Sequence, residues 1–288
     1  MNYENYDHVP GPLGAGTLSM TSAVAEQAAY DILKSELPGI DCSLVEHQGV
    51  IYFATCDSKS GLPITATTQL VQYLFDKHVD QSFFILRQRI YSTESATAYA
   101  ENMVRLAAKR ISFDLRPVDH GIETGSSFEK LAGVQSGIII SKHLTEIQHA
   151  IENQCNEVTA PAMLKQLVDL VPRGPVLHDH NRAIAAVLTD SAGKVLDVSL
   201  NQNHKNKTLH AELLLAQNYY RTTGQFIPEG SRIYVSLKPC IMCASALLRF
   251  CGQHRNIKVY YLNDDPGNKA KNSELERLSL LCSLNSDL

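Results

Sequence analysis

His210-Ala211-Glu212 and Pro239-Cys240-Ile241-Met242-Cys243 are the two stretches of sequence that decide how this chain folds. The first leads into the apolar run Leu213–Ala216, which is typical of the buried face of a helix. Cys240 and Cys243 are three positions apart, so both thiols are expected on one side of the first turn of a second helix. One imidazole and two thiolates can bind a zinc ion and leave its fourth position open. An open position indicates a catalytic rather than a structural zinc site.

Glu212 lies two residues beyond the first of these ligands and is not needed to hold the metal. Zinc lowers the pKa of a bound water from near 16 to about 7, so that hydroxide is available at neutral pH. A carboxylate beside that water can take its proton and deliver it elsewhere. The alternative interpretation is a structural zinc site or a redox Cys-x-x-Cys pair. It would leave Glu212 without a role, and a structural site would need a fourth protein ligand.

The stretches Thr208–Glu212 and Tyr234–Ala244 resemble the cytidine/deoxycytidylate deaminase superfamily of zinc-dependent nucleobase deaminases, whose signature is H-x-E followed by P-C-x-x-C. Within that superfamily they are most similar to the tRNA-adenosine deaminases. The resemblance covers about residues 160–270, under half of the chain. It implies that Glu212 is the catalytic proton carrier and that the reaction is attack of zinc-bound hydroxide on the base with release of ammonia. It also implies three Zn²⁺ ligands: His210, Cys240 and Cys243.

The resemblance further implies how a substrate is held. The backbone near Ala211 and Ser236 is expected to contact the edge of the base. An asparagine just after the second strand of the fold is expected to contact the sugar. Both Asn201 and Asn203 compete for that role, because the connection to His210 is short. The sequence leaves the choice between these two asparagines open.

Lys238 departs from the pattern of the tRNA-editing members, which usually carry glutamate immediately before the Pro-Cys pair. A lysine at the edge of the site would attract phosphate, and Lys205 and Lys207 lie on the segment that leads to His210. Scattered lysines are more commonly just solvated. The arrangement is compatible with a phosphate-bearing substrate without requiring one.

The predicted substrate is a nucleobase in a nucleoside, a nucleotide or RNA. An adenosine in tRNA is favoured, and free cytosine- or guanine-type nucleosides and nucleotides are close alternatives. From a different class, the chain could be a non-catalytic partner subunit that positions RNA and retains a structural zinc. The presence of Glu212 argues against this alternative, because a scaffold has no need of a proton carrier. Members of the superfamily commonly assemble, so a homodimer is expected.

The composition is that of an ordinary globular protein, with 44% hydrophobic and 19% charged residues among 288 positions. The net charge of -4 is uneven, with -6 before residue 151 and +2 from there on. The seven cysteines show no regular disulfide spacing, which favours a reducing compartment. Neither a signal peptide nor a run of about eighteen apolar residues is visible. We therefore expect a cytoplasmic location and no membrane partner.

A chain of this length suits two domains. We expect an N-terminal α/β domain over residues 1–152 and a deaminase domain over residues 160–288. The latter is expected to be a three-layer α/β/α sandwich with a five-stranded mixed sheet. The same order of elements is predicted in both halves, with Thr65-Ala66-Thr67 and the segment Ser92–Ala98 in place of the two metal-binding stretches. The first domain is therefore either a degenerate, metal-free copy of the second or an alternation of the kind that α/β domains show by chance.

Hydrophobic periodicity and turn residues give the expected elements. Helices are expected over residues 21–37, 67–78, 96–111, 143–152, 161–171 and 210–221, in the segment that begins at Cys240, and over 273–284. Strands are expected over residues 42–46, 50–55, 82–88, 112–118, 183–188, 195–200, 232–237 and 257–262, and residues 138–141 form a short apolar run.

Overall fold

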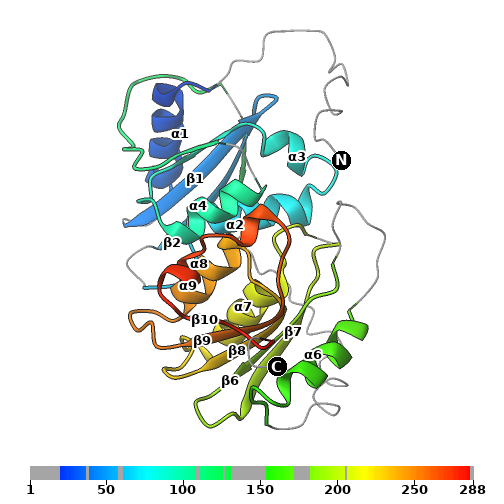
Figure 1. Ribbon diagram of the computed structural model, residues 1–288. Helices are drawn as coiled ribbons and strands as arrows, with labels where there is room; N and C mark the ends of the chain where they lie inside the picture. Colours follow the sequence, from blue (N-terminus) through cyan, green and yellow to red (C-terminus); the bar gives the residue numbers. More distant parts are fainter. Residues whose placement is uncertain are drawn as a thin grey trace.

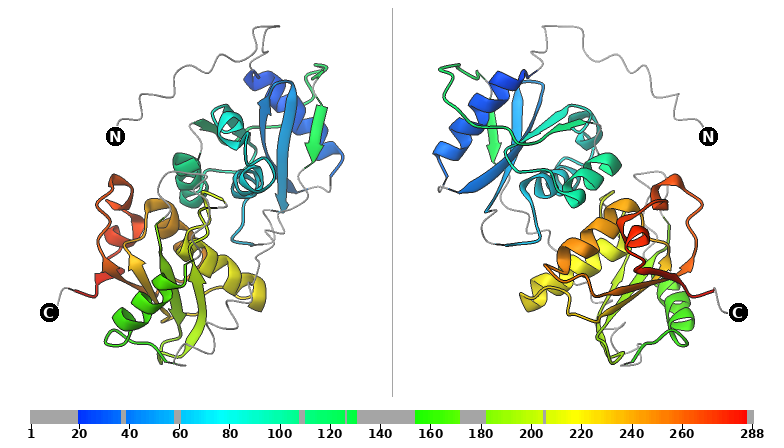
Figure 2. Two further views of the ribbon diagram at one scale, coloured as in Figure 1. Left: turned by 90° about the vertical axis from the view of Figure 1, so that its right-hand side faces the viewer. Right: turned by 60° about the vertical axis from the view of Figure 1, so that its left-hand side comes forward.

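The computed structural model of the chain describes residues 20–36, 39–57, 61–107, 110–125, 127–130, 154–171, 182–204 and 206–285. It contains two five-stranded mixed sheets, one in each half of the chain (Figure 1). Figure 2 shows helices lying against each sheet. The α/β fold class expected from the sequence is confirmed.

The N-terminal half is built around an antiparallel hairpin. Its turn residues, Gln48 and Gly49, both have positive φ, 54° and 80°, as a two-residue type I′ turn requires. The elements are α1 (Ser22–Lys34), β1 (Ile40–His47), β2 (Val50–Asp57), α2 (Ala66–Lys77), α3 (Ser82–Ile85), β3 (Arg89–Ser92), α4 (Ala98–Ala107), β4 (Arg110–Ser112) and β5 (Ser127–Lys130). The strand order is β4-β3-β1-β2-β5. One apolar cluster joins α1 to one face of this sheet, and another joins α2 and α4 to the opposite face.

The C-terminal half contains a second sheet of order β10-β9-β8-β6-β7. Its elements are α6 (Ala160–Asp169), β6 (Ala185–Thr189), β7 (Val195–Leu200), α7 (Ala211–Thr223), β8 (Arg232–Leu237), α8 (Ile241–Phe250), β9 (Lys258–Asn263), η2 (Asn268–Ala270), α9 (Glu274–Arg277) and β10 (Leu281–Ser283). Successive side chains of a strand point to opposite faces. Ala185 and Val187 accordingly pack with α6, whereas Ala186 and Leu188 pack with α7 and α8. This is the expected three-layer sandwich.

The prediction of a strand over residues 82–88 is wrong, because Ser82–Ile85 form the short helix α3. Ser82 and Ile85 are buried in the helix, while Phe83 and Phe84 are exposed. A short apolar run fits a strand or a helix, and periodicity cannot separate the two over so few residues.

The strand predicted over residues 112–118 is misplaced by several positions. β4 covers Arg110–Ser112, and Asp114 has a positive φ of 57°, which is incompatible with an extended strand. The preceding helix α4 ends at Ala107, earlier than the predicted residue 111, since the chain turns there into β4. The helix predicted over residues 143–152 and the apolar run over 138–141 lie outside the described residues.

The final helix predicted over residues 273–284 is also wrong. Ser273 caps a single helical turn, α9, through a capping box with Glu276. Ser279 then has a positive φ of 55°, which ends the helix, and Leu281–Ser283 pair with β9 in parallel. The sequence analysis missed this strand, which supplies the fifth member of the C-terminal sheet.

The two halves share one apolar core. Helices α2 and α4 of the N-terminal half pack against α7 and α8, and Figure 1 shows these helices between the two sheets. The rings of Tyr99 on α4 and Phe250 on α8 meet edge to face with their centroids 6.3 Å apart. The N-terminal half therefore buries the outer surface of the two helices that carry the metal-binding motif.

The seven cysteines are free thiols. Within the described ranges, no helix has the length and apolar character that crossing a membrane requires.

Candidate active site

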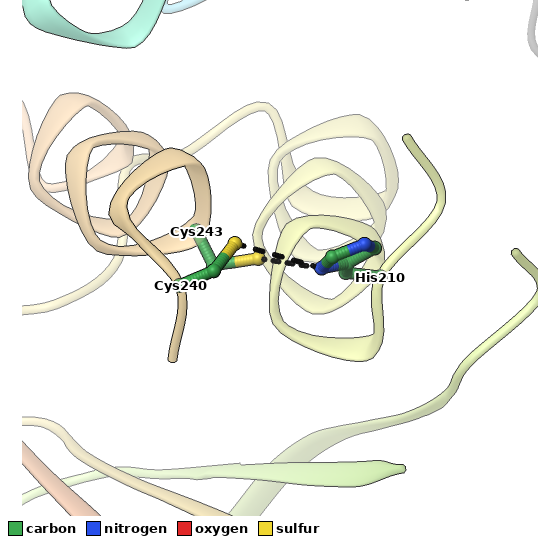
Figure 3. A group of neighbouring side chains, drawn as sticks. All are labelled: His210, Cys240 and Cys243. Atoms are coloured by element: carbon green, nitrogen blue, oxygen red, sulfur yellow. Dashed lines mark hydrogen bonds between the residues drawn. The ribbon is translucent and has the colours of Figure 1, made fainter. Parts of the chain in front are cut away.

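The predicted metal ligands meet where two helices begin. Both β7 and β8 run antiparallel to β6, so the C-terminal ends of these two strands lie at the same end of the sheet. His210 is the residue that caps the start of α7, and Cys240 has the same place at the start of α8. Both caps are extended, with ψ of 152° and 168°, and the side chains of Cys240 and Cys243 face His210 (Figure 3).

The distances among the three side chains fit a zinc ion. Nδ1 of His210 lies 3.6 Å from Sγ of Cys240 and 3.5 Å from Sγ of Cys243. Tetrahedral zinc, with bonds of about 2.0 Å to nitrogen and 2.3 Å to sulfur, places these atoms about 3.5 Å apart. The potential ligand atoms of the three residues all lie within 4.8 Å of one another, and in the described ranges no other group of three or more His, Cys, Asp or Glu residues does so. The residues therefore suit the metal without rearrangement.

The protonation of the three groups is coupled. A hydrogen bond from the Cys243 thiol and the charge of His210 lower the pKa of Cys240, despite burial. Burial and the neighbouring Cys240 raise the pKa of Cys243. Burial lowers the pKa of His210, but Cys240 and Glu212 raise it by more, so it lies above its usual range. A cation bound at this position would stabilise both thiolates.

Glu212 lies in the first turn of α7 and is only 2% exposed. Burial raises the pKa of this carboxyl to about 7, although the charge of His210 opposes the shift. Its Oε2 has no hydrogen-bond partner in the described part of the chain. A buried polar atom without a partner is costly and needs an explanation. A water or substrate group at the metal position would satisfy it.

Two of the expected substrate contacts are rigidly held. Ala211 is fully buried at the start of α7. The Oγ of Ser236 accepts a hydrogen bond from the backbone N–H of Ala185 at 3.0 Å. The backbone carbonyl of Ser236 accepts a second one from the side-chain amide of Asn263, also at 3.0 Å. The hydroxyl and carbonyl of Ser236 thus fasten the end of β8 to both neighbouring strands.

The two candidate asparagines differ in their surroundings. Asn201 is fully buried, its amide donates to the carbonyl of Arg182 at 2.7 Å, and its Oδ1 accepts from the backbone of Asn203 at 3.3 Å. Both ends of the Asn201 side chain are therefore used to shape the loop. Asn203 is only partly buried.

Lys238 is engaged within the protein. Its Nζ lies 2.6 Å from Glu276 and 3.5 Å from Asp264, and these ion pairs raise its pKa. The idea that Lys238 offers a charge to a phosphate is therefore not favoured by its contacts. Lys205 lies outside the described residues.

Asn206 is a residue that the sequence analysis missed. It is fully buried, and its amide donates to the carbonyl of Gln72 at 3.0 Å and to Asp76 at 2.7 Å, both on α2. Its Oδ1 accepts from the backbone N–H and the hydroxyl of Thr208 at 3.0 and 2.7 Å. Asn206 thus ties the segment before His210 to the N-terminal half. An asparagine bonding two residues ahead is a common turn, so Asn206–Thr208 could have been recognised as one.

Comparison with known proteins agrees with this site. Residues 175–283 match the model of the family described as Bd3614-like deaminases. This part of the chain belongs to the cytidine deaminase-like superfamily. A tRNA-specific adenosine deaminase of Haemophilus influenzae is 28% identical over 88 residues, which are 30% of this chain and 50% of the relative. The chain thus matches about half the length of that curated relative.

Solved structures of similar proteins include deaminases of several kinds. A dCMP deaminase from the cyanophage S-TIM5 is 17% identical, with a TM-score of 0.33 over 44% of this chain and 94% of the other. A guanine deaminase from Nitrosomonas europaea is 12% identical, with a TM-score of 0.37 over 50% and 84%. A tRNA deaminase that edits the wobble position is 25% identical, with a TM-score of 0.29 over 50% and 92%. The fold assignment itself follows from the strand order of the C-terminal sheet.

Proposed function

We propose that the C-terminal half is a zinc-dependent aminohydrolase that removes the amino group of a nucleobase and releases ammonia. The observation that carries this proposal is the geometry of His210, Cys240 and Cys243 next to the buried carboxyl of Glu212. A structural zinc site would give no reason to bury a carboxyl with an unpartnered oxygen beside the ligands.

The protein side of the reaction is proton transfer. When bound, zinc supplies the Lewis acidity that makes a water nucleophilic at neutral pH. Glu212 takes a proton from the attacking water and passes it to the ring nitrogen next to the reacting carbon. Glu212 then takes the remaining proton from the same oxygen and delivers it to the amine, which leaves as ammonia when the carbon–nitrogen bond breaks. Because Glu212 is only 2% exposed, its burial favours the neutral carboxyl, which helps it to hold a proton between these steps.

We propose an adenosine in tRNA as the substrate, with free nucleosides and nucleotides as the alternatives. The similarity to a tRNA-specific adenosine deaminase supports this choice. The backbone at Ala211 and Ser236 would contact the base. Asn201 or Asn203 would contact the sugar.

The test is the release of ammonia by zinc-loaded protein from a panel of nucleosides, nucleotides and tRNA. We expect ammonia from tRNA and inosine in the product. If no member of the panel releases ammonia, the catalytic proposal fails. The alternative of a non-catalytic partner subunit that positions RNA would then be favoured.

We also propose that the N-terminal half is a degenerate copy of the C-terminal fold. In both halves the first strand pairs antiparallel with the second and third, and the third pairs in parallel with the fourth. The register agrees as well. The pair Ser43–Ser92 corresponds to Ala186–Val235, with both partners 143 positions further along the chain.

Residues at corresponding positions touch each other across the two halves. The amides of Gln72 and Gln217, 145 positions apart at matching places of α2 and α7, exchange hydrogen bonds of 3.3 and 3.0 Å. Asn102 donates to Ser245, 143 positions away on α8, at 3.3 Å. Self-matching contacts are the mark of an interface with two-fold symmetry. The N-terminal half thus occupies the place that a second subunit would take.

The copy has no metal ligands at the corresponding positions. The offsets that relate the helices put Thr65 in place of His210 and Thr67 in place of Glu212. They put threonine and alanine at residues 97 and 100 in place of the two cysteines. Superposition of one half on the other should require a rotation of about 180°. A very different rotation would contradict the copy.

The homodimer and the cytoplasmic location expected from the sequence stay predictions. Because the N-terminal half covers the outer faces of α7 and α8, a second copy of the chain would have to use other surfaces. Light scattering on the full chain measures the mass of the assembly. A monomer mass would contradict the homodimer.

A further inference from the structure

Two lysines of the C-terminal half, Lys207 and Lys269, form no ion pair with a carboxylate in the described part of the chain. Lys207 precedes His210 by three residues, and Lys269 belongs to η2. Burial, followed by the charge of Lys269, lowers the pKa of Lys207. The structure records no ion pair for either lysine within its described ranges. Like charges kept together without an anion are a ready site for a phosphate.

The carboxylates nearby are already occupied. Asp265 pairs with Arg182 at 2.7 Å, while Asp264 and Glu276 both pair with Lys238. Asp76, on α2, accepts the hydrogen bond from Asn206. The positive charge of Lys207 and Lys269 is therefore not neutralised from these neighbouring elements.

Exposed aromatic rings continue from these lysines onto the N-terminal half. Nζ of Lys207 lies 5.2 Å from the ring centroid of Phe83, on α3 (Figure 1). Phe84 is the next residue, and its ring lies 5.6 Å from the guanidinium carbon of Arg87. The two phenylalanines are 37% and 49% exposed. Phe83 also packs edge to face on the buried Phe75, with the ring centroids 5.6 Å apart, so part of this ring serves the core. Phe84 and the exposed part of Phe83 lie beside cations and mark an interaction surface.

We propose that this aromatic–basic rim, formed by Phe83, Phe84, Arg87, Lys207 and Lys269, binds the nucleotides that flank the target base of a single-stranded RNA. The inference rests on the proposed function for the identity of the target. Phosphates of the strand neutralise the lysines, and unstacked bases lie on the phenylalanine rings, the combination that single-strand binders use. A mononucleotide could engage Lys207 and Lys269 but would leave Phe84 and Arg87 without a role.

The rim also gives the N-terminal half a role in the reaction, although the proposed catalytic residues all lie in the C-terminal half. α3 is part of the copy that carries no zinc ligands, yet Phe83 contacts the segment that leads to His210. The N-terminal half would thus add substrate contacts to a site that it does not build.

The test is the affinity of full-length Glu212→Gln protein for a fluorescently labelled single-stranded RNA of roughly 12 nucleotides. This background prevents turnover during the measurement. Adding Phe84→Ala should weaken binding about 5- to 150-fold, the range found when a base loses an aromatic platform. Adding Lys269→Gln should reduce the slope of log affinity against log salt by about 0.7. The matched control is Phe128→Ala. It removes a phenylalanine that is similarly exposed, at 41%, but lies on the edge strand β5 and is not part of the rim.

The outcomes separate this inference from the proposed function. If Phe84→Ala and Lys269→Gln bind RNA as Phe128→Ala does, the rim is rejected, even when the wild type releases ammonia from free nucleosides. If the two variants lose RNA affinity as expected while no substrate releases ammonia, the rim stands and the deaminase proposal fails. An acidic peptide that binds as tightly as the RNA, with the same dependence on Phe84, would overturn the assignment to RNA.

Discussion

Asn206→Ala should be among the most damaging single changes near the site, although Asn206 touches no zinc ligand. The substitution leaves two buried groups of Thr208, the backbone N–H and the hydroxyl, without their partner, and it removes the hydrogen bonds that tie the loop to Gln72 and to the exposed Asp76 on α2. Each buried group left unsatisfied costs about 1–3 kcal/mol, and local relaxation recovers part of that. We expect a loss of about 3–5 kcal/mol in the free energy of unfolding.

The assay is urea unfolding of the full chain, with Asn256→Ala as the matched control. Asn256 is exposed and makes one side-chain hydrogen bond, of 3.2 Å, to Glu229, so its loss should cost no more than about 0.5 kcal/mol. The reasoning is refuted if Asn206→Ala unfolds within about 0.5 kcal/mol of this control.

Asn206→Asp tests the hydrogen bond between residue 206 and Asp76 separately. It keeps the acceptor for Thr208 but sets a carboxylate where the amide now lies 2.7 Å from Asp76. Two carboxylates so close favour a shared proton, so the folded state would bind protons more readily than the unfolded state. The stability of this variant should therefore rise as pH falls from 7 towards 5. A flat difference from wild type over that range would contradict this reading.

The remaining predictions concern the metal and a buried acid. Purified protein should contain about one zinc per chain, and Cys243→Ala should lose it. The control is Cys251→Ala, a buried cysteine at the C-cap of α8, which should retain the zinc. Full zinc in Cys243→Ala by metal analysis would mean that the ligands are misassigned. Burial raises the pKa of Asp197 to about 6, above its unfolded value, so the folded state holds the proton longer and stability falls as pH rises between about 4 and 6. Asp197→Asn should abolish that fall and stabilise the protein above pH 6 by up to about 3 kcal/mol, whereas unfolding curves that keep the wild-type pH dependence would contradict it.

The sequence predicted the catalytic half well because its motif constrains both chemistry and position. His210, Cys240 and Cys243 are brought together as expected, since the C-terminal ends of β7 and β8 lie at the same end of the sheet. Long amphipathic segments such as α7 were also found. The short elements α3 and β10 were not, because four or fewer residues carry too little periodicity. Backbone conformations such as the positive φ of Ser279 have no residue-type signature outside glycine and asparagine.

Contacts between the two halves were out of reach for a different reason. Gln72 and Gln217 look like ordinary helical glutamines, and only the packing of α2 and α4 on α7 and α8 makes their pairing visible. For Lys238 the sequence suggested a contact that the structure does not favour. The lysine beside the motif looked available to a phosphate, but in the fold it pairs with Asp264 and Glu276, which are distant in the sequence. Long-range partners of charged side chains cannot be read from local sequence.

In the proposed reaction Glu212 carries protons beside a zinc ion that His210, Cys240 and Cys243 would hold. The most direct measurement is the rate of ammonia release by zinc-loaded Glu212→Gln beside wild type, on whichever member of the substrate panel wild type deaminates. Glutamine keeps the shape of the side chain but cannot shuttle a proton, so the rate should fall by about 10²–10⁴-fold while zinc content is unchanged. A rate within about tenfold of wild type would contradict the account.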